Sequence, residues 1–125
     1  MWQKIIYLGI AGGVGTVARY FVSGVVQRYG GAGFPLGTAA VNVLGCVLFG
    51  VVWAVLESRV SVSGQMRMVI FVGFFGGFTT FSSFAFETSQ LMDEGEWLLA
   101  MGNAAVQNVL GIAAMVAGLA VGKMI

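Results

Sequence analysis

Residues 73–84, GFFGGFTTFSSF, join an apolar run to residues that destabilise a helix. Glycine is unfavourable inside helices, and paired threonines add branched side chains with restricted rotamers. The stretch lies within residues 66–92, an apolar segment longer than the ~20 residues that a helix needs to cross a bilayer. We therefore expect a membrane helix that is broken at residues 76–80, in the middle of the membrane.

The break has two interpretations. Backbone that leaves a helix at membrane depth must find partners in protein or water, and the freed carbonyls often hold a cation. Alternatively, Gly73 and Gly77 have the GxxxG spacing of a helix-packing face. The pattern alone does not choose between these two roles.

Three further apolar segments occupy residues 3–28, 36–56 and 97–122. The chain of 125 residues is 58% apolar and 9% charged, whereas soluble domains carry roughly 25% charged residues. Four spans with short connections use up the whole length. We predict an all-α integral membrane protein, a single four-helix domain over residues 1–125, as a multi-pass protein of the cell (inner or plasma) membrane.

Several functional classes are disfavoured. The chain has no histidine, the usual general base and commonest metal ligand, and its lone Cys46 cannot form an intrachain disulfide. The net charge of +1 suggests no nucleic-acid partner. GVGTVA at residues 13–18 matches a dinucleotide fingerprint, but it lies in a membrane span without the required strand or a nearby acid. We expect no enzyme.

Two charges fall within the apolar segments, Arg19 in the first and Glu87 in the third. A charge at mid-bilayer costs roughly 2.5–3.5 kcal/mol on insertion scales. Each residue therefore needs a partner, an aqueous vestibule, or a position from which its side chain reaches the interface.

Uncharged polar side chains recur on three of the four segments. Thr38 and Asn42 are four residues apart, hence on one helix face, and so are Asn103 and Gln107. Amide donors without histidine suit anion passage better than proton coupling. Each residue alone would serve equally as a hydrogen bond between helices, but together they favour a polar conduit. The full set is Thr38, Asn42, Ser82, Ser83, Asn103, Gln107 and Asn108.

Phe81 and Phe84 lie three residues apart after the break, on one helical face. Such a pair is ordinarily part of a core. Because an aromatic ring carries a positive edge, two rings presented edge-on beside an Asn amide would also solvate a small anion.

Three motifs together resemble the Fluc (CrcB) family of fluoride ion channels: GGVGTVARY at residues 12–20, GTAAVN at 37–42, and GFFGGFTTFSSF at 73–84 with Glu87 following. The resemblance implies small four-helix subunits that pair as antiparallel, dual-topology dimers. It also implies passive export of fluoride from the cytoplasm, which relieves fluoride toxicity, through two pores per dimer. A structural sodium ion is expected at the dimer centre.

The resemblance also assigns residues. It places sodium on the backbone carbonyls of Gly76 and Thr79, and lines each pore with Asn42, Phe81 and Phe84. The remaining polar positions that it suggests are Thr38, Thr80, Ser82 and Ser83 along the pore, and Glu87 and Arg19 at a vestibule or pore mouth.

Two features depart from the family pattern. Its fourth helix usually offers Tyr and Ser to the pore, whereas residues 97–122 offer the amides Asn103 and Gln107. The second departure concerns orientation, because four basic residues fall on one side of the membrane and Arg28 alone on the other. That bias favours one orientation, while an antiparallel homodimer needs both. An oppositely oriented paralogue as partner would reconcile them. The four basic residues are Lys4, Arg59, Arg67 and Lys123.

Two other functions compete with that of a channel. A small multidrug-type, proton-coupled exporter relies on a carboxylate in its first helix, where this chain has only Arg19. A non-conducting membrane scaffold would need glycine packing alone, which leaves the combination of Asn42, Phe81 and Phe84 without a purpose.

Overall fold

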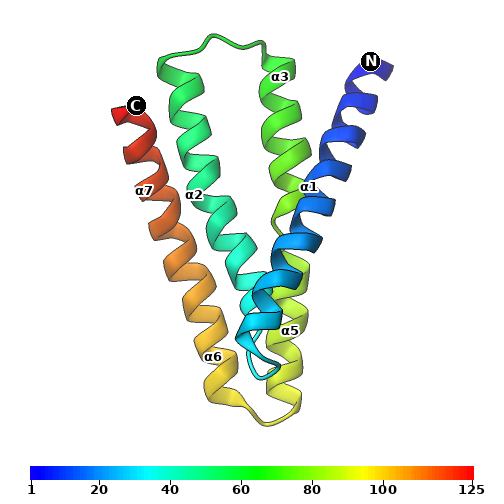
Figure 1. The fold of residues 1–125 in the computed structure, drawn as a ribbon, viewed down its shortest axis with the longest axis vertical. Helices are drawn as coiled ribbons and strands as arrows, with labels where there is room; N and C mark the ends of the chain where they lie inside the picture. Colours follow the sequence, from blue (N-terminus) through cyan, green and yellow to red (C-terminus); the bar gives the residue numbers. More distant parts are fainter.

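The computed structural model describes residues 1–125 as four long helical rods (Figure 1). The first two rods are α1 (Trp2–Gly30) and α2 (Leu36–Ser58). The third is divided into α3 (Gly64–Met68), the π-helix η1 (Val69–Phe75), α4 (Gly76–Phe78) and α5 (Phe81–Asp93). The fourth consists of α6 (Trp97–Ala105), the π-helix η2 (Val106–Leu110) and α7 (Gly111–Met124).

Each rod is long and apolar enough to cross a membrane. The four spans have 23 to 30 residues and are predominantly apolar. At a rise of 1.5 Å per residue, even the shortest exceeds the ~30 Å hydrocarbon thickness. The prediction of an all-α, multi-pass membrane protein is confirmed. The predicted segments lie inside the observed rods, which extend slightly further at most ends.

The third rod is interrupted near its midpoint by two extended residues. Thr79 has φ −92° and ψ 160°, and Thr80 has φ −149° and ψ 116°. Residues 76–78 remain helical, so the interruption is narrower than the predicted 76–80.

The glycines before this interruption serve packing instead. A Cβ added to Gly77 would collide with the backbone of Gly12 in α1, and one added to Gly73 would lie 2.9 Å from the Cβ of Ala11. Both interpretations left open by the sequence therefore apply, each to different residues. The glycines pack against α1, and the threonines that follow them interrupt the helix.

The rods pack through glycines and aromatic rings. Between α2 and α7, a Cβ on Gly50 would lie 2.6 Å from the carbonyl oxygen of Met115. Between α2 and η1, the ring centroid of Phe49 lies 4.6 Å from that of Phe71 and 5.3 Å from that of Phe75. These contacts hold α2 between the third and fourth rods, which places its side chains beside the interruption.

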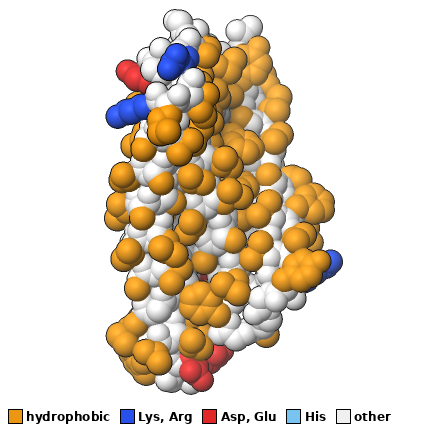
Figure 2. All heavy atoms as spheres, turned by 60° about the vertical axis from the view of Figure 1, so that its left-hand side comes forward, with side chains coloured by type: hydrophobic (Ala, Val, Ile, Leu, Met, Phe, Trp, Pro, Cys, Tyr) orange, Lys and Arg blue, Asp and Glu red, His pale blue; other side chains and the backbone are white.

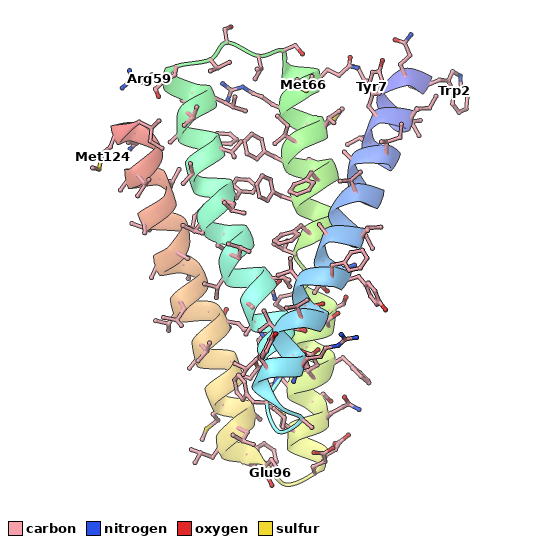
Figure 3. The ribbon with its side chains drawn as sticks, viewed as in Figure 1. Trp2, Tyr7, Arg59, Met66, Glu96 and Met124 are labelled. Carbon is pink, nitrogen blue, oxygen red and sulfur yellow. The ribbon has the colours of Figure 1, made fainter.

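Charge divides between the two ends of the bundle. Figure 2 shows apolar side chains over the middle of the molecule and acidic side chains at one end. Basic side chains lie mainly at the other end, beside an acidic one, and a further basic side chain lies toward the acidic end. Figure 3 places Trp2, Arg59, Met66 and Met124 at one end and Glu96 at the opposite end. Only 21 of 125 residues are buried in the single chain, so much of its apolar side surface is available to lipid or to another subunit.

Candidate functional site

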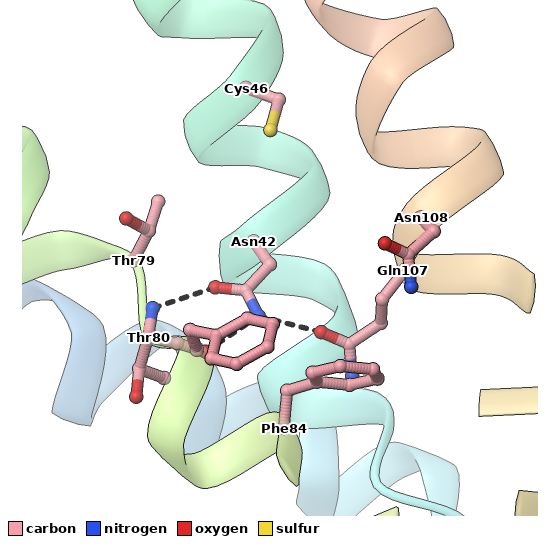
Figure 4. A pocket seen from close by; sticks show the side chains of 8 residues that line it. Asn42, Cys46, Thr79, Thr80, Phe84, Gln107 and Asn108 are labelled. Atoms are coloured by element: carbon pink, nitrogen blue, oxygen red, sulfur yellow. Dashed lines mark hydrogen bonds between the residues drawn. The ribbon is translucent and has the colours of Figure 1, made fainter. Parts of the chain in front are cut away.

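A pocket of about 220 Å³ opens beside the interruption of the third rod (Figure 4). Residues from α2, the third rod and η2 form its walls, so three rods meet there. The lining residues are Asn42, Cys46, Thr79, Thr80, Phe81, Phe84, Gln107 and Asn108.

The Asn42 side chain forms hydrogen bonds with the extended backbone, where a continuous helix would supply a backbone partner. Its Oδ1 accepts a hydrogen bond of 2.8 Å from the N–H of Thr80, and its Nδ2 donates to the Thr80 carbonyl at 3.0 Å. The same Nδ2 donates to Oε1 of Gln107 at 2.6 Å. Figure 4 shows Asn42 between these two partners. The side chain thus pairs backbone groups that leave the helical hydrogen-bond pattern at membrane depth.

Thr80 also caps the helix that restarts after the interruption. Its Oγ1 accepts from the N–H of Ser83 at 3.2 Å and donates to Oγ of Ser83 at 3.0 Å. Oγ of Ser82 lies 3.4 Å from the same hydroxyl. Ser82 and Ser83 therefore contact Thr80, which lines the pocket, but they do not line it themselves. Ser82 is exposed on the single chain.

The same hydrogen bonds free two backbone carbonyls. In a continuous helix the N–H of Thr80 would bond the carbonyl of Gly76, and that of Ser83 would bond the carbonyl of Thr79. Here these donors turn to Asn42 and to the Thr80 hydroxyl. The Thr79 carbonyl instead lies 3.4 Å from Nη1 of Arg19. Freed carbonyls suit a hard monovalent cation, so the donor set of Gly76 and Thr79 fits the expected sodium ligands.

Phe81 and Phe84 form an aromatic pair at the pocket. Their ring centroids are 5.5 Å apart at an angle of 56°. Phe84 is half-buried, whereas Phe81 is 76% exposed. Phe81 thus lines the pocket while most of its side chain is uncovered in the single chain.

Thr38 and Glu87 lie away from this pocket, although the sequence grouped them with it. The Thr38 hydroxyl donates to Oε1 of Glu87 at 2.7 Å. Glu87 lines a second pocket of about 290 Å³ beside the turn between α1 and α2. Gln27 shapes that turn, since its amide donates to the carbonyls of Gly31 and Phe34 and accepts from a backbone N–H of α2. Thr38 thus lies along α2 between the two pockets.

The fourth rod contributes through its π-helix. Gln107 and Asn108 are consecutive residues of η2, and both line the pocket. Asn103 lies behind them, fully buried at 0% exposure. Of the two amides predicted on this side, only Gln107 reaches the pocket.

Sequence reasoning left one lining residue out of the site, Cys46, whereas Asn108 was already grouped with the polar conduit. Cys46 follows Asn42 by four residues and therefore shares its helix face, which was an available signal.

Comparison with known proteins gives consistent matches over the chain. The family model described as CrcB-like protein, Camphor Resistance (CrcB), matches residues 6–119. The fluoride-specific ion channel FluC of Nitrosococcus oceani is 47% identical over 125 residues, covering all of both chains. That of Nitratidesulfovibrio vulgaris (strain Miyazaki F) is 49% identical over 123 residues, covering 98% of this chain and 99% of the relative. That of Desulforapulum autotrophicum is 43% identical over the full length of both.

Proposed function

This chain belongs to the CrcB family of ion channels, which are not enzymes, and we propose that it forms a fluoride-selective channel. In this proposal fluoride leaves the cytoplasm passively, which relieves its toxicity. The observation that carries the proposal is the pocket at the interruption, which Asn42 lines together with the paired rings of Phe81 and Phe84.

The chemistry of the pocket supports passage of a small anion. Fluoride is compact and strongly hydrated, so a path through the membrane must replace its water with strong donors. Amide N–H groups and the positive edges of aromatic rings supply such donors. The eight lining residues include no carboxylate that would repel an anion and no basic side chain that would trap it.

We further propose that sodium binds at the dimer centre through the carbonyls of Gly76 and Thr79. The support is the diversion of the N–H groups of Thr80 and Ser83 to side chains, which leaves both carbonyls without their helical donors. The Thr79 carbonyl lies 3.4 Å from Nη1 of Arg19 and keeps a second lone pair for the ion. A buried positive charge there would lower the cost of bringing fluoride to mid-membrane, because charges interact strongly at low dielectric. Arg19, which donates to the Thr79 carbonyl, adds a second positive charge nearby.

The proposed assembly is an antiparallel dimer with a second copy of this chain. Opposed subunits would place the basic end of one against the acidic end of the other, so the charge separation along the bundle becomes complementary. The exposed Phe81 ring would find a partner surface in the same dimer. Two-fold symmetry then gives two equivalent pores. A paralogue of opposite orientation would satisfy the same complementarity, and it would also satisfy the orientation bias of the basic residues.

Efflux from liposomes tests the proposal. Vesicles carrying the purified protein are loaded with fluoride or with chloride, and the external anion is followed with an ion-selective electrode. We expect rapid loss of fluoride and retention of chloride. Fluoride loss no faster than from protein-free vesicles would refute the channel.

A further inference from the structure

A chain of side-chain hydrogen bonds runs from the pocket into the bundle. Beyond the bond from Asn42 to Gln107, Nε2 of Gln107 donates to Oδ1 of Asn103 at 2.9 Å. Nδ2 of Asn103 then donates to Oγ1 of Thr88 at 2.9 Å, and the Thr88 hydroxyl donates to the Phe84 carbonyl at 2.7 Å. Every member donates in the same direction, away from the pocket.

With the hydrogen bonds donated in this direction, the pocket offers an anion few free N–H donors. Both hydrogens of the Asn42 amide are engaged, one by the Thr80 carbonyl and one by Gln107. Gln107 turns its oxygen toward Asn42, and an oxygen repels an anion. Fluoride therefore gains a second N–H donor here only if Gln107 turns its amide around.

The chain can reverse without leaving its buried members unpaired. A carboxamide exchanges its oxygen and nitrogen by a half-turn, and a hydroxyl both donates and accepts. In reverse, the Thr88 hydroxyl donates to Asn103, and the Asn103 amide donates to Gln107. The Phe84 carbonyl lies four residues before Thr88 within α5, so the helical backbone still supplies it with a donor. Because Asn103, Gln107 and Thr88 are all buried, this pairing matters: an unpaired buried amide is costly.

Resting on the proposed function, we propose that Gln107 is an anion ligand of this channel. Fluoride in the pocket reverses the hydrogen bonds through Gln107, Asn103 and Thr88, so that Nε2 of Gln107 and Nδ2 of Asn42 donate to it together. The π-helix η2 makes this possible, since it turns Gln107 into the pocket while Asn103 stays behind it. Two converging amides favour a small anion over a larger one such as chloride.

Replacing Gln107 by methionine tests whether Gln107 promotes or hinders fluoride efflux. Gln107→Met keeps the length of the side chain and removes its amide. If Gln107 is a ligand, fluoride efflux per incorporated channel falls about tenfold or more, as for loss of a charge-assisted hydrogen bond. If Gln107 only competes with fluoride for Asn42, efflux stays equal or rises, which would overturn the proposal. Gln65→Met, in α3 and outside the pocket, is the matched control and should retain wild-type efflux.

Side-chain amide NMR of the wild-type protein provides a second readout, which stands even if Gln107→Met does not assemble. The chain has only three Asn and five Gln, so their amide signals can be assigned by single substitutions. We expect fluoride, but not chloride, to shift the amide protons of Gln107 and Asn42 downfield. Movement of Asn42 without Gln107 would overturn the role of Gln107 and leave the channel intact. Movement of neither, together with absent efflux, would overturn the proposed function as well.

Discussion

Replacing Asn42 by leucine should destabilise the interruption of the third rod. Asn42 is the partner of the Thr80 N–H at 2.8 Å and of the Gln107 oxygen at 2.6 Å. Leucine has a similar size and bonds neither group. Each buried polar group left unpaired costs about 1–3 kcal/mol, so the two together predict a loss of about 2–6 kcal/mol in the free energy of unfolding.

The loss can be measured by reversible unfolding in mixed micelles of mild detergent and dodecyl sulfate, followed by circular dichroism. Asn108→Leu is the matched control, because Asn108 is exposed and its amide bonds only the Ala104 carbonyl. We expect the control to stay within about 0.5 kcal/mol of wild type, as exposed substitutions usually do.

Hydrogen exchange locates the effect within the chain. In wild type the Thr80 amide should exchange slowly because it is bonded to Asn42, and in Asn42→Leu it should exchange much faster. If the leucine variant unfolds like Asn108→Leu and keeps a protected Thr80 amide, the role assigned to Asn42 is wrong.

Three further predictions address the rings, the glycine packing and the ion. Phe81→Ile and Phe84→Ile should each lower fluoride efflux about two- to tenfold, the worth of an aromatic contact, with the dimer intact by cross-linking; wild-type efflux would exclude the rings from the pore. Gly77→Ala should cost about 1–3 kcal/mol in the free energy of unfolding, since its Cβ meets the α1 backbone. Gly102→Ala, with open space at its Cβ, should be near neutral, and equal effects would contradict the packing role. Replacing sodium by a large organic cation should shift the dimer toward monomer on size exclusion, and an unchanged equilibrium would argue against a sodium ion between subunits.

The sequence predicted the rods well because hydropathy acts over whole segments. Positions within the rods were harder to predict. Gly76 and Gly77 were predicted as part of the break, but residues 76–78 are helical and Gly77 packs against the backbone of α1. The actual interruption needs only Thr79 and Thr80, because Asn42 supplies the bonds that extended backbone lacks.

Some residues that the sequence placed in one site lie apart in the structure, for reasons that their spacing does not reveal. Thr38 and Asn42 share a helix face, yet Thr38 bonds Glu87 at 2.7 Å, toward a different pocket. Asn103 and Gln107 also share a face, but the π-helix η2 begins between them and changes the register. Hydrogen-bond register inside a helix responds to packing with neighbouring rods, so it left no pattern in the local sequence.

The reversal potential of the reconstituted protein in a planar bilayer would test whether it is a fluoride channel. With fluoride on one side and an equal concentration of chloride on the other, the current of a fluoride-selective channel should reverse only at a large potential of the sign set by the fluoride gradient. A pH difference across the bilayer should leave that potential unchanged, because passive conduction carries no coupled proton. A reversal potential near zero, or one that follows the pH difference, would contradict fluoride-selective passive conduction.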